Sequence, residues 1–162
     1  MTMPFEPYRG TVEPQWIDYN GHMNVAYYVL LFDRASDHFL DRFDLGGDYR
    51  RRTDHSIYVL EMHVQYLREV KVGDPLVIET HLAGADAKRM HLVHKMTHAL
   101  EGYVAATNEI MALHVDLAGP RSAPFPPETA ARIEKLATEH RTKPLPIEIG
   151  RRIALPSPSG AH

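Results

Sequence analysis

The chain has 162 residues, of which 44% are hydrophobic and 24% are charged, a balance typical of one soluble globular domain. It contains no cysteine, which excludes disulfides, thiolate nucleophiles and cysteine-type zinc sites. With 18 Lys and Arg against 21 Asp and Glu the net charge is -3, so the chain as a whole does not attract polyanions and we expect no nucleic-acid partner.

The first part of the chain predicts a strand and a long helix. Residues 7–16 are predicted to form a strand that ends at the turn sequence Asp-Tyr-Asn-Gly of residues 18–21. Residues 23–43 carry apolar side chains at spacings of three and four, as in a helix: Val25, Tyr28, Phe32, Ala35, Phe39 and Phe43. The run 25–32 is apolar on every side, so we expect other parts of the chain to enclose the first half of this helix.

Two strands are predicted after a loop at residues 46–54, which carries the basic run Arg-Arg-Arg at residues 50–52. In residues 57–70 apolar and polar side chains alternate, as on the two faces of a strand. The apolar face is expected to hold Tyr58, Leu60, Met62, Val64 and Tyr66, and the opposite face Glu61, His63 and Gln65. A turn at residues 72–75 leads to a further predicted strand at residues 76–83.

The histidine-rich residues 89–100 fit two interpretations. A helix would place His91, His94 and His98 on one face, at a spacing that zinc ligands use. A strand would turn His91 away from the other two histidines, and it explains the alternation of Met90, Leu92, Met96 and Leu100. We favour the strand and expect no bound metal.

The rest of the chain predicts a central strand at residues 103–117, which is apolar on both faces, and an amphipathic helix at residues 128–139. Residues 1–140 are therefore expected to form a single domain, and residues 141–162 a Pro-rich, mobile tail. No uncharged apolar stretch approaches the roughly 18 residues of a membrane span, and the N-terminus lacks the pattern of a signal peptide. We expect a cytoplasmic protein without a membrane partner.

This order of elements predicts an α+β fold in which a curved five-stranded antiparallel sheet wraps one long buried helix, with a further helix near the C-terminus. A single curved sheet leaves its edges and one face exposed. We therefore expect a homodimer or a dimer of dimers that covers them.

Residues 18–24 place a carboxylate, an imidazole and two amides in the turn that opens the long helix. The N-terminus of a helix has unpaired N–H groups and a partial positive charge, so it can stabilise a developing oxyanion. Asp18, one turn away, could attack a carbonyl carbon or activate water. The alternative interpretation makes Asp18, Asn20 and Asn24 turn and N-cap residues, and His22 an ordinary surface or capping histidine.

Glu61 and His63 share one strand face, which is consistent with a wet sheet surface, a dimer interface or a pocket wall. No serine lies in a nucleophile elbow, and the glycine-rich motifs that bind nucleotides do not occur. Nucleotide hydrolysis and dinucleotide redox chemistry therefore have no support in the sequence.

Two segments carry a resemblance to a known family. Residues 18–24 have the motif Asp-Tyr-Asn-Gly-His-Met-Asn ahead of Tyr28 and the apolar helix, and residues 66–74 have Tyr-Leu-Arg-Glu-Val-Lys-Val-Gly-Asp late in the second strand. Over residues 7–127 the chain resembles the hot-dog-fold acyl-CoA thioesterases of the 4-hydroxybenzoyl-CoA thioesterase type. The resemblance implies dimers with active sites at the subunit interface, no metal, and hydrolysis of a thioester carried on coenzyme A (CoA), with CoA as part of the substrate and no separate cofactor.

The same resemblance assigns roles in the turn. Asp18 is expected to be the catalytic carboxylate, and the backbone N–H of Val25 is expected to meet the oxyanion. The side chains of Asn20, His22 and Asn24 are expected to shape the turn or position water.

Further candidates come from the residues themselves. Glu61, with His63, is expected to face the reaction centre and orient water or a polar acyl group. The CoA phosphates are expected to lie near Lys88 and Arg89, with Arg68 and Lys71 as weaker candidates, because long cationic side chains at strand ends can reach a polyanion. The alternative is that all four are solubilising surface charges.

Residues 61–70 and 113–125 look more specifically like those of thioesterases linked to carnitine breakdown, which act on betainyl-CoA. Such a substrate carries a quaternary ammonium group, which an aromatic face attracts by roughly 0.5–2 kcal/mol when the contact is desolvated. The candidate aromatic residues are Trp16, Tyr19, Tyr27, Tyr28 and Tyr66, and their alternative role is to fill the core.

Two other functions stay open for this fold, an acyl-CoA hydratase or dehydratase and a non-catalytic acyl-CoA-binding module. Hydratases of the fold use an Asp and a His separated by four residues, whereas Asp18 and His22 have three residues between them. This spacing favours hydrolysis.

Overall fold

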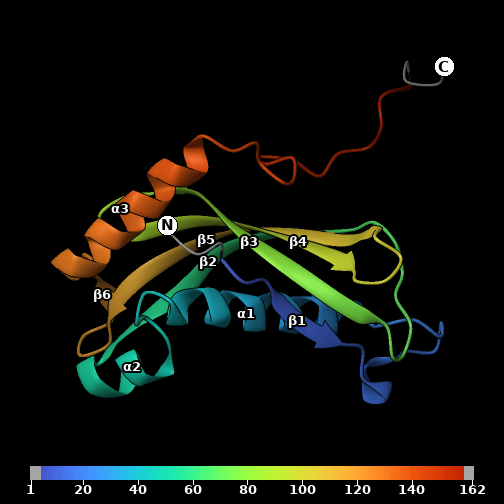
Figure 1. Cartoon of the computed structure of the whole chain (residues 1–162), viewed down its shortest axis with the longest axis horizontal. Coiled ribbons are helices and arrows are strands. Elements are labelled where there is room, and N and C mark those ends of the chain that lie inside the picture. The colour runs from blue at the N-terminus through green and yellow to red at the C-terminus, as the bar shows by residue number, and fades with distance from the viewer. Residues whose placement is uncertain (1–4, 159–162) are drawn as a thin grey trace.

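The computed structural model describes residues 5–158, which form one antiparallel sheet curved over a long helix (Figure 1). Its strands are β1 (Tyr8–Thr11), β2 (His55–Tyr66), β3 (Pro75–Ala85), β4 (Arg89–His98), β5 (Val104–Asp116) and β6 (Arg121–Ser122). The order across the sheet is β1-β3-β4-β5-β2, and the short β6 pairs with β5. The predicted α+β hot-dog architecture is confirmed, with β6 as an addition.

The helices are α1 (Val25–Asp41), α2 (Gly47–Thr53) and α3 (Pro127–Arg141). The curved sheet covers α1, and we call the side that faces α1 the inner face of the sheet and the other side the outer face (Figure 1). Helix α3 packs along β3 beyond the end of β1, where the Leu82 N–H donates to His140 Nδ1 at 3.0 Å. The β3 edge of the sheet is therefore covered by β1 and α3.

Helix α1 forms where the sequence predicts it and is buried for the predicted reason. Its apolar stripe includes Leu31, Phe32, Ala35 and Phe39, each 0% exposed. Removing a large apolar side chain from water contributes about 1.5–3 kcal/mol, so this stripe is a main source of stability. It packs in two continuous clusters against the inner face of the sheet.

Strand β2 departs from the predicted alternation because it contains a bulge. The register with β5 shifts between Val59 and Glu61, which leaves Leu60 as an extra residue. Tyr58 therefore shares the outer face with Glu61, whereas Met62 lies on the inner face opposite Ile110. The expectation that Tyr58 and Met62 share one face was wrong, because a bulge shifts the period by one residue.

Two other local predictions were wrong. The first strand ends at Thr11, and the 3-10 helix Pro14–Trp16 replaces its predicted second half, because proline fixes φ and cannot donate to a sheet ladder. Most of the predicted loop at residues 46–54 is helix α2, which ends at Asp54 in the left-handed conformation (φ 54°). Tyr49 anchors this helix, since it is 7% exposed and its hydroxyl lies 2.8 Å from His114 Nε2.

The strand interpretation of residues 89–98 is confirmed, and it places His94 in the core. His94 is 0% exposed, with Nε2 3.1 Å from Ser36 Oγ and Nδ1 3.0 Å from Thr80 Oγ1. Ser36 donates its proton to the Phe32 carbonyl, so it accepts from His94 Nε2–H, which leaves Nδ1 to accept from the Thr80 hydroxyl in the neutral ring. Within residues 5–158 no group of three His, Asp or Glu side chains is placed to bind a metal.

The burial of His94 makes stability depend on pH. Burial lowers the pKa of His94 to about 3, whereas an unfolded histidine titrates near 6.5. Above pH 6.5 the ring is neutral in both the folded and the unfolded chain. As the pH falls from 6.5 toward 3, only the unfolded chain takes up the proton. The free energy of unfolding therefore falls by up to about 1.4 kcal/mol per pH unit. We expect the free energy of unfolding to fall between pH 6.5 and 4.5, and to fall less steeply in His94→Gln. Equal slopes in urea melts of the two proteins would contradict this assignment.

Candidate active site

Residues 17–24 form a tight turn whose backbone is fixed at both ends. The Asp18 N–H donates to the His22 carbonyl at 3.0 Å, and the Gly21 N–H donates to the Asp18 carbonyl at 3.0 Å. Gly21 has φ +79°, a conformation that side chains disfavour, which explains the glycine of the motif. The turn is therefore rigid, and the Asp18 side chain projects from a defined backbone.

The same turn is bonded to two neighbouring segments. The Met23 N–H donates to the Val70 carbonyl at 2.9 Å, and the Asn24 N–H donates to the Trp16 carbonyl at 2.9 Å. Trp16 ends the 3-10 helix just before the turn, whereas Val70 follows β2, so the start of α1 is bonded to the preceding segment and to one far along the chain. Among residues 66–74, Val70 thus contributes a backbone carbonyl that helps to hold the turn.

The first turn of α1 has an unused donor at Val25, a residue that lines the cavity beside Asp18. Asn24 is the N-cap, because its Oδ1 accepts from the Ala26 N–H at 3.0 Å, and its carbonyl accepts from the Tyr27 N–H at 3.0 Å. In the described part of the chain no acceptor lies within hydrogen-bond distance of the Val25 N–H. This N–H, at the positive end of the helix, can donate to a bound carbonyl oxygen.

This cavity is open and has a volume of about 280 Å³. It is lined by Asp18, Asn20, His22, Met23, Val25, Tyr28, Tyr66, Leu67, Arg68 and Glu69. Asp18 Oδ1 accepts from the Asn20 N–H at 2.8 Å, while Oδ2 has no hydrogen-bond partner among residues 5–158. The cavity thus brings together a carboxylate oxygen free to react and a free backbone donor.

Two tyrosines form an aromatic wall of the cavity. The rings of Tyr28 and Tyr66 meet edge to face with centroids 5.1 Å apart, and the Tyr66 hydroxyl donates to the Val25 carbonyl at 3.2 Å. Burial raises the pKa of Tyr28 to about 12, so its phenol is neutral at physiological pH. Tyr66 is 47% exposed, and its ring is open to a ligand.

The structure separates the other aromatic candidates from this cavity. Trp16 is buried and stacks on Tyr27, with centroids 5.5 Å apart, and Tyr19 is 97% exposed. The cavity also includes Leu67 and Glu69, which were not predicted as site residues. The only feature of the sequence that could have identified them is their position in residues 66–74, which carry the family resemblance.

The predicted phosphate-binding residues lie at two ends of the sheet. Arg68 lines the Asp18 cavity, stacks on the Tyr103 ring at 3.8 Å and lies 3.8 Å from a Glu101 carboxylate oxygen. Lys71 is exposed in the turn between β2 and β3, outside the lining of the cavity.

Lys88 and Arg89 are at the opposite end of the sheet from Asp18, where β4 begins next to the last residues of β5. Lys88 donates from Nζ to Ser122 Oγ at 2.9 Å, and Arg89 pairs with Asp86 at 2.7 Å. A single chain does not bring these two cations to the Asp18 cavity, and their role in phosphate binding stays a prediction.

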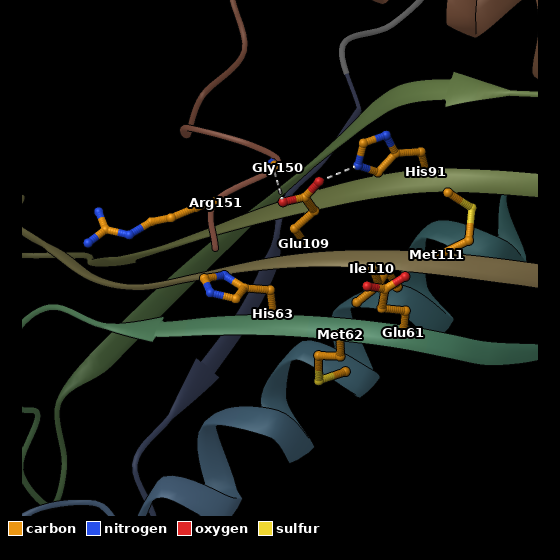
Figure 2. Close-up of a pocket in the computed structure, with 9 residues that line it drawn as sticks. All are labelled: Glu61, Met62, His63, His91, Glu109, Ile110, Met111, Gly150 and Arg151. Atoms are coloured by element: carbon orange, nitrogen blue, oxygen red, sulfur yellow. Dashed lines mark hydrogen bonds and ion pairs between the residues drawn. The ribbon is translucent and has the colours of Figure 1, made fainter. Parts of the chain in front are cut away.

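Glu61 and His63 belong to a second cavity of about 300 Å³, on the outer face (Figure 2). Figure 2 shows Met62 pointing from the same strand toward α1, on the other side of the sheet. In one chain Glu61 therefore lies across the sheet from Asp18. The role expected for Glu61 at the reaction centre stays a prediction that the geometry of a single chain does not support.

The segment that follows α3 closes one side of this outer cavity. Glu109 Oε1 lies 2.7 Å from His91 Nε2, and its Oε2 accepts from the Gly150 N–H at 2.9 Å (Figure 2). With its amide oxygen toward Arg151, Gln65 accepts from Arg151 Nε at 3.2 Å. The tail expected at residues 141–162 thus contacts the sheet at residues 150–151, and residues 159–162 lie outside the described part of the chain.

Comparisons with known proteins agree with this fold. Residues 12–133 match the model of the thioesterase-like superfamily. The chain is 42% identical over 156 residues to a betainyl-CoA thioesterase of Pseudomonas aeruginosa, covering 96% of this chain and 98% of that protein. It is 37% identical over 150 residues, 93% of its length, to an L-carnitine dehydrogenase/betainyl-CoA thioesterase of Agrobacterium fabrum, of which it covers 30%.

A solved structure shows the same fold with CoA present. A Staphylococcus aureus protein in complex with CoA superimposes with a TM-score of 0.85 and 28% sequence identity, covering 96% of this chain and 100% of that chain. No helix within residues 5–158 is long and apolar enough to cross a membrane. The predicted resemblance is confirmed: the chain belongs to the thioesterase-like superfamily and is a thioester hydrolase that acts on acyl-CoA.

Proposed function

We propose that Asp18 catalyses this hydrolysis, converting an acyl-CoA to the free acid and CoA. The observation that carries the assignment is the placement of the free Asp18 Oδ2 and the free Val25 N–H in one cavity at the N-terminus of α1. The reaction needs no cofactor beyond the CoA that the substrate carries. The absence of cysteine fits a reducing compartment, and we place the enzyme in the cytoplasm.

The geometry supports a reaction in which the thioester carbonyl oxygen accepts from the Val25 N–H. Asp18 either attacks the carbonyl carbon, forming a mixed anhydride that water hydrolyses, or takes a proton from the water that attacks. In both routes the C–S bond breaks, and the CoA thiolate leaves and is protonated. A thioester has a good leaving group, so a carboxylate suffices as the reacting group.

The neighbouring residues keep this arrangement in place. Asn24 caps the helix that supplies the donor, Asn20 holds one oxygen of Asp18, and His22 lines the cavity beside it. A preorganised donor of this kind stabilises the transition state by about 3–4 kcal/mol, because it needs no reorientation during the reaction.

For the acyl group we propose betaine, as in the Pseudomonas aeruginosa relative. The Tyr66 ring is exposed in the cavity, and Glu69 adds a carboxylate to the lining. Both features favour a cationic group next to the thioester, because an aromatic face and a carboxylate attract a quaternary ammonium.

Replacing Tyr66 tests whether its ring recognises the positive charge of the betainyl group. We compare betainyl-CoA with 3,3-dimethylbutanoyl-CoA, in which a carbon replaces the quaternary nitrogen and the shape is kept. Tyr66→Leu should lower kcat/KM for betainyl-CoA about tenfold more than for the neutral substrate, on the scale of one cation–π contact. Tyr66→Phe keeps the ring and should keep the preference for the cation. An equal loss for both substrates in Tyr66→Leu would contradict a role in recognising the charge.

We also propose that the enzyme is a homodimer joined along β2. Unlike the β3 edge, the outer edge of β2 has no strand paired to it in the described residues. Five exposed apolar side chains lie on this strand or directly after it: Tyr58, Val59, Leu60, Tyr66 and Leu67. When the β2 edges of two copies pair antiparallel, a two-fold axis relates them. The exposed apolar residues of one β2 then cover the same residues of the other.

This arrangement also completes the cavity. Tyr66 and Leu67 are 47% and 55% exposed in the single chain, and both line the Asp18 cavity. A second copy along β2 therefore covers the open side of the site. The reacting groups become partly enclosed, which strengthens their electrostatic interactions with the substrate.

The two other functions of this fold make different predictions for the same assay. A thioesterase releases free thiol from acyl-CoA, a hydratase changes the acyl chain without releasing thiol, and a binding module does neither. A screen over short, aromatic, long and cationic acyl-CoAs tests the proposed reaction and the proposed acyl group together.

A further inference from the structure

Three consecutive arginines lie in the last turn of α2, where cations stabilise the end of a helix. Arg50, Arg51 and Arg52 are all exposed, and Arg51 pairs with Asp48 one turn earlier. Neither Arg50 nor Arg52 has a carboxylate within ion-pair distance among residues 5–158. The buried Tyr49 fixes the helix to the sheet, so the backbone that carries the three exposed arginines has a defined position.

In one chain these arginines are far from the Asp18 cavity. Helix α2 lies at the C-terminal end of α1 and leads into β2, whereas Asp18 precedes the N-terminal end of α1 (Figure 1). The cavity lies beside the last residue of β2, Tyr66, and α2 joins the first residue, His55. The arginines and the cavity are thus at opposite ends of the same edge strand.

The proposed dimer brings the arginines of one chain close to the Asp18 cavity of the other. When two β2 strands pair antiparallel about a two-fold axis near Leu60, the Tyr66 end of one strand lies beside the His55 end of the other. The axis is perpendicular to the sheet, so both α1 helices stay on the same side of the joined sheet. The partner's α2 therefore comes to the end and the side of the sheet where Asp18 lies.

We propose that the partner subunit's Arg50, together with the two arginines that follow it, binds the phosphates of CoA at the mouth of the Asp18 cavity; this inference rests on the proposed function and on the proposed dimer. Arginine suits the task because its planar guanidinium pairs with two phosphate oxygens at once. The chain as a whole has a net charge of -3, so a local basic cluster of this kind supplies an attraction for a polyanionic substrate that the net charge does not. Each site then uses both chains: one for catalysis, the other for the nucleotide end of CoA.

The first experiment removes the cluster and follows KM. Replacing residues 50–52 by Gln should raise KM for an acyl-CoA at least tenfold and leave kcat within about twofold, because the phosphates are remote from the reacting bond. An acyl-pantetheine without phosphates should show the same KM with both enzymes. The matched control is Arg9→Gln, Lys135→Gln and Arg141→Gln, which removes three exposed cations elsewhere and should leave KM unchanged.

A second variant reverses the charge instead of removing it, and a thermal melt checks that it is folded. Arg50→Glu with Arg52→Glu keeps the ion pair of Arg51 with Asp48 and reverses two charges. It should raise KM for acyl-CoA further than the Gln variant does. A KM for acyl-CoA within twofold of the wild type in this folded variant would overturn the proposal.

The decisive experiment asks which chain supplies the arginines. Asp18→Asn chains and chains with Gln at residues 50–52 are co-expressed with different affinity tags, and the mixed dimer is purified through both tags. If the arginines act across the interface, one of its two sites combines Asp18 with intact arginines, so the mixed dimer regains the wild-type KM at half the wild-type kcat. If they act within their own chain, the mixed dimer keeps the high KM, and the inference is wrong.

These outcomes separate the inference from the proposals on which it rests. An Asp18→Asn homodimer with native turnover would remove the catalytic assignment, whatever KM the arginine variant shows. A fully active monomer in light scattering would remove the dimer and the inference together. With both proposals intact, an unchanged KM in the arginine variants removes the inference alone.

Discussion

Asp18→Asn should lower kcat for acyl-CoA hydrolysis by a hundredfold or more while the protein stays folded and dimeric. The amide has nearly the same shape and can still accept from the Asn20 N–H, so the turn keeps its main hydrogen bond. It is a poor nucleophile and a poor base, so the reacting group is lost, and a general base contributes about 100- to 10,000-fold. Steady-state kinetics with a thiol reagent and a thermal melt measure both effects.

A matched variant distinguishes the catalytic role from a structural one. Asn24→Ala removes the side chain that caps α1 and should cost about 1 kcal/mol of stability, with a smaller effect on kcat than Asp18→Asn. If Asp18 were only a turn residue, Asp18→Asn would resemble this capping variant: most activity kept, with a small loss of stability. Near-native turnover in Asp18→Asn would contradict the proposed mechanism.

Leu60→Lys should convert the dimer to a monomer and lower kcat/KM at least tenfold. Leu60 is 56% exposed at the bulge of β2, near the proposed two-fold axis, so the substitution brings two like charges together and disfavours pairing of the edges. The monomer loses the second wall of the cavity and the partner's arginines. Light scattering at micromolar concentration and kinetics on the same sample test this.

An exposed leucine elsewhere provides the control. Leu100 is 84% exposed in the hairpin between β4 and β5, so Leu100→Lys should leave both the dimer and kcat/KM unchanged. A Leu60→Lys protein that stays dimeric would place the interface on another surface. A monomeric Leu60→Lys protein with full activity would show that one chain suffices for catalysis.

The sequence predicted the elements whose side chains follow one period without interruption. The helix around Phe32 and the strand segments around Ile78 and Met96 are such elements, and these three side chains are 0% exposed. The sequence did not predict the bulge at Leu60, because nothing in the local pattern shows which strand will be its partner. Helix α2 was missed because its seven residues are mostly polar and it is fixed by one distant contact, from Tyr49 to His114.

The residues of the candidate site likewise fall into those that the sequence predicted and those that it did not. Asp18, His22 and Val25 were predicted together because they lie in one short motif, and the structure places all three in one cavity. The cations expected to bind CoA were chosen for their positions at strand ends, and the ends at which they lie depend on how the whole sheet is assembled. The role proposed for the arginines of α2 depends on the edge strand that the structure shows and on the two-fold symmetry proposed for it.

The most direct test of the central claim is to count products with betainyl-CoA as substrate. Purified enzyme is incubated with betainyl-CoA, and free thiol, betaine and remaining thioester are measured over time. Hydrolysis at the Asp18 cavity predicts one thiol and one betaine for each thioester consumed with the wild type, and at least a hundredfold slower release with Asp18→Asn. Thioester that is bound but not consumed, an acyl chain altered without thiol release, or equal rates in the two proteins would contradict the account.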